Sequence, residues 1–263
     1  HMPFDPIYFL IVVAGFIAGI INTLAGSGSL ITLPILELLG LPLQVANGTN
    51  RIAILLQNIV GIRGFSEKKI LDRNGLRQFG IPSIIGWAIG SYLATIISPD
   101  LFRSAFGYIM VFMLFIILLR PKKWLIGEIT LLENKPTISQ YLLFFLIGIY
   151  GGFIQAGVGI FLLSGLVLGA GYNLIHANAV KVGIVLMSTS LTFWIFIVQG
   201  QVNFKAGFIL AIGNMLGAWV GTKIAVEKGT IWIRRLLILI VTISSLKLLG
   251  IFELLLMHPM GST

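Results

Sequence analysis

Long apolar runs, separated by short polar segments, occupy most of the chain. Their apolar residues are continuous rather than alternating, which predicts buried or lipid-facing helices and disfavours the strands of a membrane barrel. A helix needs about 20 residues to cross the hydrocarbon core of a bilayer. The runs of about this length span residues 7–25, 78–97, 101–119, 141–163, 182–198, 206–222 and 231–252.

The composition agrees with a membrane protein. Hydrophobic residues make up 57% of the chain and charged residues 10%, whereas a soluble domain has about 25% charged residues. The chain contains no cysteine, which excludes disulfides, thiolate metal sites and cysteine nucleophiles. We therefore expect an all-α integral membrane protein with its lipid bilayer as partner, and we expect no cofactor and no metal site.

The basic residues predict how the chain lies in the membrane. Five Lys and Arg residues fall in 63–77, four in 120–138 and four in 222–235, against Arg103 and Lys205 in the loops expected on the other side. Because cytoplasmic loops carry the excess of Lys and Arg, the three basic segments are expected to be cytoplasmic. The net charge of +9 thus reflects orientation, and we expect no nucleic-acid partner.

The two halves of the chain align with each other at an offset of 131 residues, without a gap, from about residue 22 to residue 94. The aligned pairs include Gly26 with Gly157, Gly28 with Gly159, Gly40 with Gly171, Asn47 with Asn178 and Gly86 with Gly217. The basic loop at 63–77 aligns with 194–208, which holds only Lys205. The halves are therefore expected to have opposite orientations, as in secondary transporters built from inverted repeats.

Each half is interrupted at the same place. "AGSG" at 25–28 precedes a short segment at 29–40, and "AGVG" at 156–159 precedes another at 160–171. We expect about 8–10 transmembrane helical segments with these short, broken helices near the midplane, whether they cross fully or are re-entrant. Both termini should then lie outside. The predicted organisation is a first repeat at 1–120, a cytoplasmic linker at 121–138, a second repeat at 139–258 and a terminal tail at 259–263.

Two cations, Arg51 and Lys181, interrupt apolar stretches. A lone charge at the centre of a transmembrane helix costs about 2.5–3.5 kcal/mol, so such residues usually face a cavity or a partner. Arg51 is adjacent to Asn50, which aligns with Lys181, and Glu37 is the single acid inside an apolar segment. This excess of positive charge predicts a small anion as ligand.

Neutral groups that suit an anion surround both cations in the sequence. Glycine turns let an oxyanion approach the backbone, and asparagine and threonine side chains donate hydrogen bonds. Gln57, Asn58, Ser188 and Thr189 could line a path. The predicted binding residues are Gly26, Ser27, Gly28, Asn47, Thr49, Asn50, Arg51, Gly157, Gly159, Asn178 and Lys181.

Structural roles are the alternatives for the same residues. Arg51 and Lys181 could pair with Glu37 or with helix C-terminal carbonyls, and Asn47 and Asn178 could cap helices. Glycines spaced as in "GFIAG" and "GIYGG" are typical of close helix packing. Glu37 and His176 are candidates for proton coupling. His176 could instead be a capping or interfacial residue, and the counterpart of Glu37 is Leu168.

Several stretches resemble the sulfite exporter TauE/SafE family of membrane proteins. They are "GFIAGIINTLAGSGSLITLPILELLGLPLQVANGTNRIAILL", "GIYGGFIQAGVGIFLLSGLVLGAGYNLIHANAVKVGIVL" and "GNMLGAWVGTKIAVEKG". The resemblance covers nearly the whole chain and implies movement of sulfite, a sulfonate or sulfoacetate across the cytoplasmic membrane, usually by export. Many relatives have more glycines where this chain has "AGSG".

The function expected from these observations is secondary transport of a small sulfur-containing anion, coupled to a proton or to the membrane potential. An anion channel could use the same cations. A membrane-embedded enzyme is less well supported, because the chain has no cysteine and no HExxH motif. The absence of a GxxxxGK motif argues against direct use of ATP. The sequence does not determine the oligomeric state.

Overall fold

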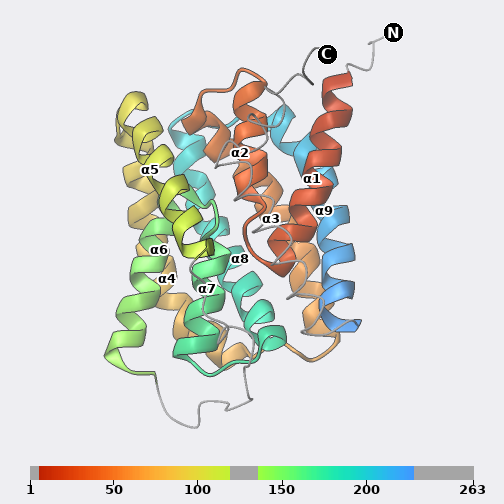
Figure 1. Ribbon diagram of the computed structural model, residues 1–263, viewed down its shortest axis with the longest axis vertical. Coiled ribbons are helices and arrows are strands. Elements are labelled where there is room, and N and C mark those ends of the chain that lie inside the picture. The colour runs from red at the N-terminus through yellow and green to blue at the C-terminus, as the bar shows by residue number, and fades with distance from the viewer. Residues whose placement is uncertain (1–5, 119–135, 228–263) are drawn as a thin grey trace, which may run out of the picture.

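The computed structural model describes residues 6–118 and 136–227, and all regular elements within them are helices (Figure 1). The predicted apolar run at 231–252 lies outside the described residues. The helices are α1 (Pro6–Leu24), α2 (Ser29–Leu38), α3 (Leu43–Glu67), α4 (Arg73–Ile96), α5 (Pro99–Leu118), α6 (Ile138–Ile154), α7 (Val158–Ser164), the π-helix η2 (Gly165–Gly169), α8 (Leu174–Val198) and α9 (Phe204–Glu227).

Several of these helices have the length and composition of membrane spans. Within the described residues, Ile7–Leu24, Arg73–Ile96, Leu174–Val198 and Phe204–Glu227 qualify. Helix α3 has 25 residues, which is long enough to cross, but its polar side chains lower its mean hydropathy. The polar side chains from Gln44 to Asn58 are buried, because the interior of the bundle shields this part of α3 from lipid. The predicted all-α membrane fold is confirmed.

Helix bounds repeat at the offset found in the sequence. Adding 131 to the bounds of α3, Leu43–Glu67, gives those of α8, Leu174–Val198, and adding it to α4 gives α9. The turns repeat as well, since Gly26 and Gly157 have φ of 73° and 74°. Left-handed backbone of this kind favours glycine because it has no Cβ. The duplication is therefore visible in three dimensions as well as in the sequence.

Helices α3 and α8 pack against each other in antiparallel directions. The guanidinium of Arg51 lies over the ring of Phe196, while a Cβ added to Gly61 would lie 3.2 Å from Val182. Residue numbers thus rise along α3 as they fall along α8. Equivalent helices of an inverted repeat would meet in this way, and the inverted repeat stays a prediction.

Each half of the chain contributes one long helix to the other half. Helix α9 packs along α1 and α3, helix α4 packs along α6 and α8, and α3 meets α8 in the middle. We call α1, α2, α3 and α9 the first unit, and α4, α6, α7, η2 and α8 the second unit. The compact bodies of the fold are therefore these units and not the contiguous sequence halves.

Glycines let the helices of each unit approach closely. A Cβ on Gly19 would lie 2.3 Å from the carbonyl oxygen of Asn214, between α1 and α9. A Cβ on Gly152 would lie 2.1 Å from the carbonyl oxygen of Trp87, between α6 and α4. Backbone contact of this kind is typical of small-residue interfaces between transmembrane helices.

The two short helices fold back on the helices before them. Gly151 of α6 lies beside Val158, and the Nε2 of Gln140, near the start of α6, donates to the carbonyl oxygen of Gly169 at 2.5 Å. Helix α7 with η2 therefore runs antiparallel to α6. Likewise, a Cβ on Gly28 would lie 2.2 Å from the carbonyl oxygen of Ala18, so α2 starts alongside α1. In both pairs the short helix turns back along the helix before it (Figure 1), and whether the short helices cross the membrane or are re-entrant stays open.

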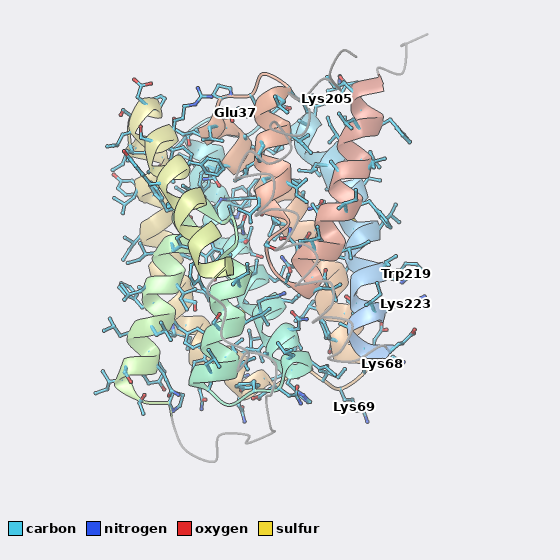
Figure 2. The ribbon with its side chains drawn as sticks, viewed as in Figure 1. Glu37, Lys68, Lys69, Lys205, Trp219 and Lys223 are labelled. Carbon is cyan, nitrogen blue, oxygen red and sulfur yellow. The ribbon has the colours of Figure 1, made fainter. Side chains whose placement is uncertain are left out.

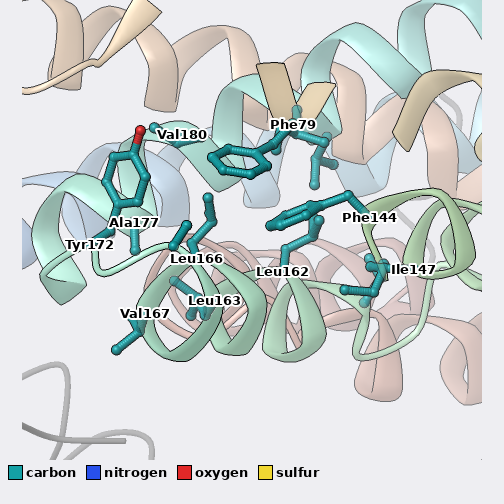
Figure 3. Close-up of a cluster of buried hydrophobic side chains, with 14 of the residues drawn as sticks. Phe79, Phe144, Ile147, Leu162, Leu163, Leu166, Val167, Tyr172, Ala177 and Val180 are labelled. Atoms are coloured by element: carbon teal, nitrogen blue, oxygen red, sulfur yellow. The ribbon is translucent and has the colours of Figure 1, made fainter. Parts of the chain in front are cut away.

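Apolar side chains hold the hairpin of α6 and α7 inside the second unit. Phe79 of α4 and Phe144 of α6 pack with ring centroids 4.5 Å apart (Figure 3). Leu162 and Leu166, from α7 and η2, belong to the same buried cluster. This packing fixes the position at which α6 ends and α7 begins, and therefore the position of the turn between them.

Charged residues gather at opposite ends of the bundle. Figure 2 shows Lys68, Lys69 and Lys223 at one end, whereas Glu37 and Lys205 lie at the other. The predicted cytoplasmic loops at 63–77 and 222–235 thus share an end within the residues that the structure describes. Which of the two ends is cytoplasmic stays a prediction.

Candidate functional site

The two glycine turns that interrupt the halves touch inside the bundle. A Cβ on Gly26 would lie 2.2 Å from the Cα of Gly159, and the N–H of Gly159 donates to the carbonyl oxygen of Gly26 at 3.1 Å. No side chain fits between them. The ends of α1 and α6 and the beginnings of α2 and α7 therefore converge on one small region.

Lys181 reaches this region from α8 and caps the end of α1. Its Nζ donates to the carbonyl oxygens of Asn22 and Thr23 at 3.0 and 2.9 Å, and to Oδ1 of Asn178 at 2.7 Å. The last carbonyls of a helix have no partner within the helix and form its negative end, which favours a cation. Lys181 is 2% exposed, so these three acceptors replace its hydration.

Arg51 reaches from α3 to the end of α6 in a related manner. Its Nη2 donates to the carbonyl oxygen of Gly152, and its Cζ lies 4.2 Å from the ring centroid of Phe196. The side chain is fully buried, and Nε and Nη1 have no hydrogen-bond partner. Two structural pairings were predicted for these cations, one with Glu37 and one with helix C-terminal carbonyls. Both Arg51 and Lys181 make the pairing with helix C-terminal carbonyls.

The neighbouring polar residues extend this capping. Asn47 donates to the carbonyl oxygen of Phe153 at 2.9 Å, and Asn178 donates to that of Leu24 at 3.3 Å. These aligned asparagines lie inside α3 and α8, since the N-cap positions are Pro42 and Asn173. They therefore close the ends of α6 and α1 instead of capping their own helices.

Asn50 and Thr49 hold α3 to other segments. Asn50 accepts from Oγ1 of Thr32 at 2.7 Å and donates to Oγ of Ser29 at 3.1 Å, which ties α3 to α2. Thr49 accepts from the backbone N–H of Asn203 at 2.9 Å. Both side chains are fully buried, and each has its partner within the protein.

A small cavity, lined by both polar and apolar residues, lies where the units meet. Its volume, counted as space for the centres of water molecules, is about 20 Å³, and a single water needs about 10–15 Å³ on that measure. An anion of four heavy atoms does not fit in this conformation. The cavity is lined by Asn22, Gly26, Ser29, Ile54, Gln57, Asn58, Gln155, Val158, Gly159, Lys181 and Val185.

Amide side chains supply most of the polar lining. Gln57 accepts from Nδ2 of Asn22 at 3.3 Å and from Nδ2 of Asn214 at 3.1 Å. Gln155 donates to Oγ1 of Thr189 at 2.9 Å, and its Oε1 has no partner. The lining residues include one cation, Lys181, and no carboxylate. The cavity is therefore positive and rich in groups that donate hydrogen bonds.

The predicted binding residues separate into three groups. Gly26, Gly159 and Lys181 line the cavity. Ser27, Gly28 and Gly157 belong to the adjoining turns, where the N–H of Gly28 donates to Oδ1 of Asn22 at 2.7 Å. Arg51 and Asn178, with the asparagines and threonine of α3, cap helices or join segments around the cavity without lining it.

The two residues considered for proton coupling lie elsewhere. Glu37 pairs with Arg103, and its side chain is 31% exposed. Nδ1 of His176 lies 2.9 Å from Oδ1 of Asn173, which also accepts from the backbone N–H of His176. His176 thus belongs to the capping interaction at the start of α8, and Glu37 to an ion pair between α2 and α5.

Three polar lining residues were not identified from the sequence: Asn22, Ser29 and Gln155. Asn22 and Gln155 are polar residues at the ends of apolar runs, just before the glycine turns. That position was the signal that could have identified them. In the part of the chain that the structure describes, no group of three or more His, Cys, Asp and Glu side chains could hold a metal ion.

Comparison with known proteins agrees with the membrane fold. The family model described as "Sulfite exporter TauE/SafE" matches residues 11–248. The "Probable membrane transporter protein ORF9" of Sinorhizobium sp. is 28% identical over 90% of this chain and 90% of its own length.

Two further relatives carry similar names. A "Probable membrane transporter protein" of Haemophilus influenzae is 29% identical over 86% of this chain and 88% of its own length. The "Probable membrane transporter protein YfcA" of Escherichia coli K12 is 27% identical over 92% of this chain and 88% of its own length. No solved structure matches the chain. The chain belongs to the sulfite exporter TauE/SafE family and is a multi-pass membrane transporter.

Proposed function

We propose that this transporter is a secondary carrier that exports a small sulfur-containing anion, such as sulfite, a sulfonate or sulfoacetate, across the cytoplasmic membrane. The observation that carries the proposal is Lys181, a cation that lines a buried cavity with no carboxylate among the lining residues. Burying a charge is costly unless it is paired. An anion entering the cavity would neutralise this charge.

The neutral lining suits a sulfur oxyanion. Asn22, Gln57, Asn58 and Gln155 carry amide groups, and Ser29 carries a hydroxyl, so each has N–H or O–H donors for sulfonate oxygens. The description of the family names sulfite export, which supports this class of substrate. Sulfite and small sulfonates would then compete for one site.

The architecture supports alternating access. Inverted repeats place substrate sites near the bilayer midplane, where interrupted helices meet. Helices α1 and α6 end at touching glycine turns, and the equivalent helices α3 and α8 run antiparallel. The cavity is too small for the anion in this conformation, so we propose that the two units separate on one side of the membrane at a time. We propose that both termini lie outside the cell.

Binding and transport can be measured together. Calorimetry on purified protein would use sulfite, sulfate, thiosulfate, taurine and sulfoacetate, and flux would be measured in proteoliposomes. Lys181→Gln should abolish both binding and flux, whereas Lys68→Gln, which removes an exposed cation, should leave them unchanged. If Lys181→Gln binds sulfite as tightly as the parent, the cavity is not the site.

We propose a proton gradient or the membrane potential as the driving force. Flux into vesicles would be recorded with each gradient imposed separately, and with Glu37→Gln and His176→Gln beside the parent. Flux that follows neither gradient would exclude this coupling. Electrical conductance in planar bilayers would favour an anion channel over a carrier.

A further inference from the structure

Both buried cations cross the boundary between the two units. Lys181 belongs to the second unit and caps α1 of the first unit, whereas Arg51 belongs to the first unit and caps α6 of the second. Movement of one unit against the other therefore acts on both contacts, and it can change one while the other persists. The two side chains differ in how many of their hydrogen-bond donors are already in use.

Lys181 has no donor to spare. An ammonium group has three N–H donors, and all three are occupied by the carbonyl oxygens of Asn22 and Thr23 and by Oδ1 of Asn178. An anion that bonds directly to Nζ must displace at least one of these acceptors. Two of the three are backbone carbonyls, which cannot rotate away on their own, so Nζ loses them when the end of α1 and the Lys181 side chain move apart.

The position of the cavity indicates which acceptor is displaced. Asn22 and Lys181 line the cavity, whereas Thr23 and Asn178 do not. An anion in the cavity therefore lies beside Asn22 and Lys181, which makes the Asn22 carbonyl the first candidate for displacement. Asn178 lies three residues before Lys181 on α8 and moves with it, so its contact survives a displacement of α1.

Arg51 offers the contrasting case. Its Nη2 holds the carbonyl oxygen of Gly152, while Nε and Nη1 are unpaired. Gly152 also accepts from Oγ of Ser91 at 3.2 Å, within the second unit. The ring of Phe196 covers the guanidinium. Arg51 can thus keep its contact across the boundary while the contact of Lys181 is exchanged.

We propose that Lys181 is a switch that exchanges the α1 carbonyls for the transported anion, while Arg51 is a constant anchor between the units. This inference rests on the proposed function of the cavity. Anion binding loosens the contact between α1 and α8 and permits the units to separate. Because linkage is reciprocal, any change that strengthens the α1 contact weakens anion binding by the same factor.

Distances between the units report the exchange. The chain has no cysteine, so cysteine pairs can be introduced without background and labelled with an iodoacetamide spin label, whose thioether withstands sulfite. One pair joins exposed positions Ser139 of α6 and Lys223 of α9, and the other joins Ile96 of α4 and Lys205 of α9. The pairs span the units at opposite ends of the bundle. Sulfoacetate and sulfite are the probes, each at saturation.

Saturating anion should lengthen the mean distance of one pair in the parent protein. Lys181→Gln should show the longer distance without anion and no response to it, because its amide has two donors instead of three. Lys68→Gln, an exposed cation outside the boundary, should behave as the parent. The parent with and without anion is sufficient if Lys181→Gln does not fold.

Two outcomes distinguish the switch from the site itself. If calorimetry shows saturable binding that requires Lys181 but neither distance changes, the anion replaces only Asn178 and the switch is wrong while the site stands. If neither probe binds, the proposed function fails and the switch fails with it. A longer distance on binding, lost in Lys181→Gln, establishes both.

Discussion

Gly26 and Gly159 join the two interrupted halves through backbone alone. The N–H of Gly159 donates to the carbonyl oxygen of Gly26 at 3.1 Å, and a Cβ on either residue would lie 2.2 Å from the Cα of the other. This contact places the ends of α1 and α6 beside the cavity. The site therefore depends on two residues without side chains.

Replacement of Gly26 by alanine should destabilise the protein severely. Its φ of 73° costs an L-residue about 1–2 kcal/mol, and the steric clash with Gly159 adds overpacking of about 1–3 kcal/mol. Gly40→Ala is the matched control, because Gly40 has φ of 84° but nothing within 4 Å of an added Cβ. Thermal unfolding in detergent should show a much larger loss for Gly26→Ala. Equal losses would mean that the turns do not touch.

Loss of the hydroxyl of Tyr172 should weaken the second unit. This hydroxyl donates to Oδ2 of Asp72 at 2.5 Å, and Asp72 caps α4 through Oδ1. A hydrogen bond to a charged group contributes about 1.5–3 kcal/mol, so Tyr172→Phe should lower the free energy of unfolding by that order. The effect should disappear in an Asp72→Ala background, which removes the acceptor, if the pair acts as described.

The stability that the hydrogen bond between Tyr172 and Asp72 contributes should not depend on pH near neutrality. Burial, followed by the hydrogen bond and the charge of Asp72, raises the pKa of Tyr172 above its usual value of 10.0. A pKa raised by folding gives stability that is complete below the unfolded pKa and is lost as the pH rises through the folded value. The difference in free energy of unfolding between the parent and Tyr172→Phe should thus be constant from about pH 7 to 9 and shrink only in strong alkali. A difference that shrinks near neutral pH would contradict this assignment.

Stacking of Arg51 on Phe196 should contribute to stability. The Cζ of Arg51 lies 4.2 Å from the ring centroid, and a desolvated cation over an aromatic ring gains about 0.5–2 kcal/mol. Phe196→Leu should therefore lower the free energy of unfolding more than Phe65→Leu does. Phe65 is the matched control, because it is a fully buried phenylalanine in an apolar cluster. A double-mutant cycle with Arg51→Met isolates the stacking energy. A coupling energy of zero would leave Phe196 as packing alone.

Zwitterions should bind the cavity more weakly than simple anions. Taurine and 2-hydroxyethanesulfonate have the same heavy-atom skeleton, but taurine carries an ammonium where the other has a hydroxyl. The lining residues offer no carboxylate to an ammonium, and an unpaired buried charge costs at least about 1–3 kcal/mol. Calorimetry should show at least about tenfold weaker binding of taurine. Equal affinities would place the binding site elsewhere.

The sequence by itself determined the class of the protein and the repeat. A soluble fold could not bury so many continuous apolar runs, so the composition predicts a membrane protein. The turns at Gly26 and Gly157 were visible because left-handed backbone requires glycine. The offset of 131 that aligned the halves also relates the bounds of α3 to those of α8. The apolar runs and the turns depend on residues close together in the chain, and the repeat needs only a comparison of the sequence with itself.

Only the tertiary structure decided the roles of the polar residues. Arg51 and Lys181 occupy neighbouring positions in the alignment, yet Lys181 lines the cavity and Arg51 does not. The sequence also could not show that α4 and α9 are exchanged between the halves or that Asn22 and Gln155 face the cavity. Which carbonyl a buried cation reaches depends on where a distant helix ends. That position is set by packing between segments more than 100 residues apart, as in the pairing of Lys181 with the end of α1.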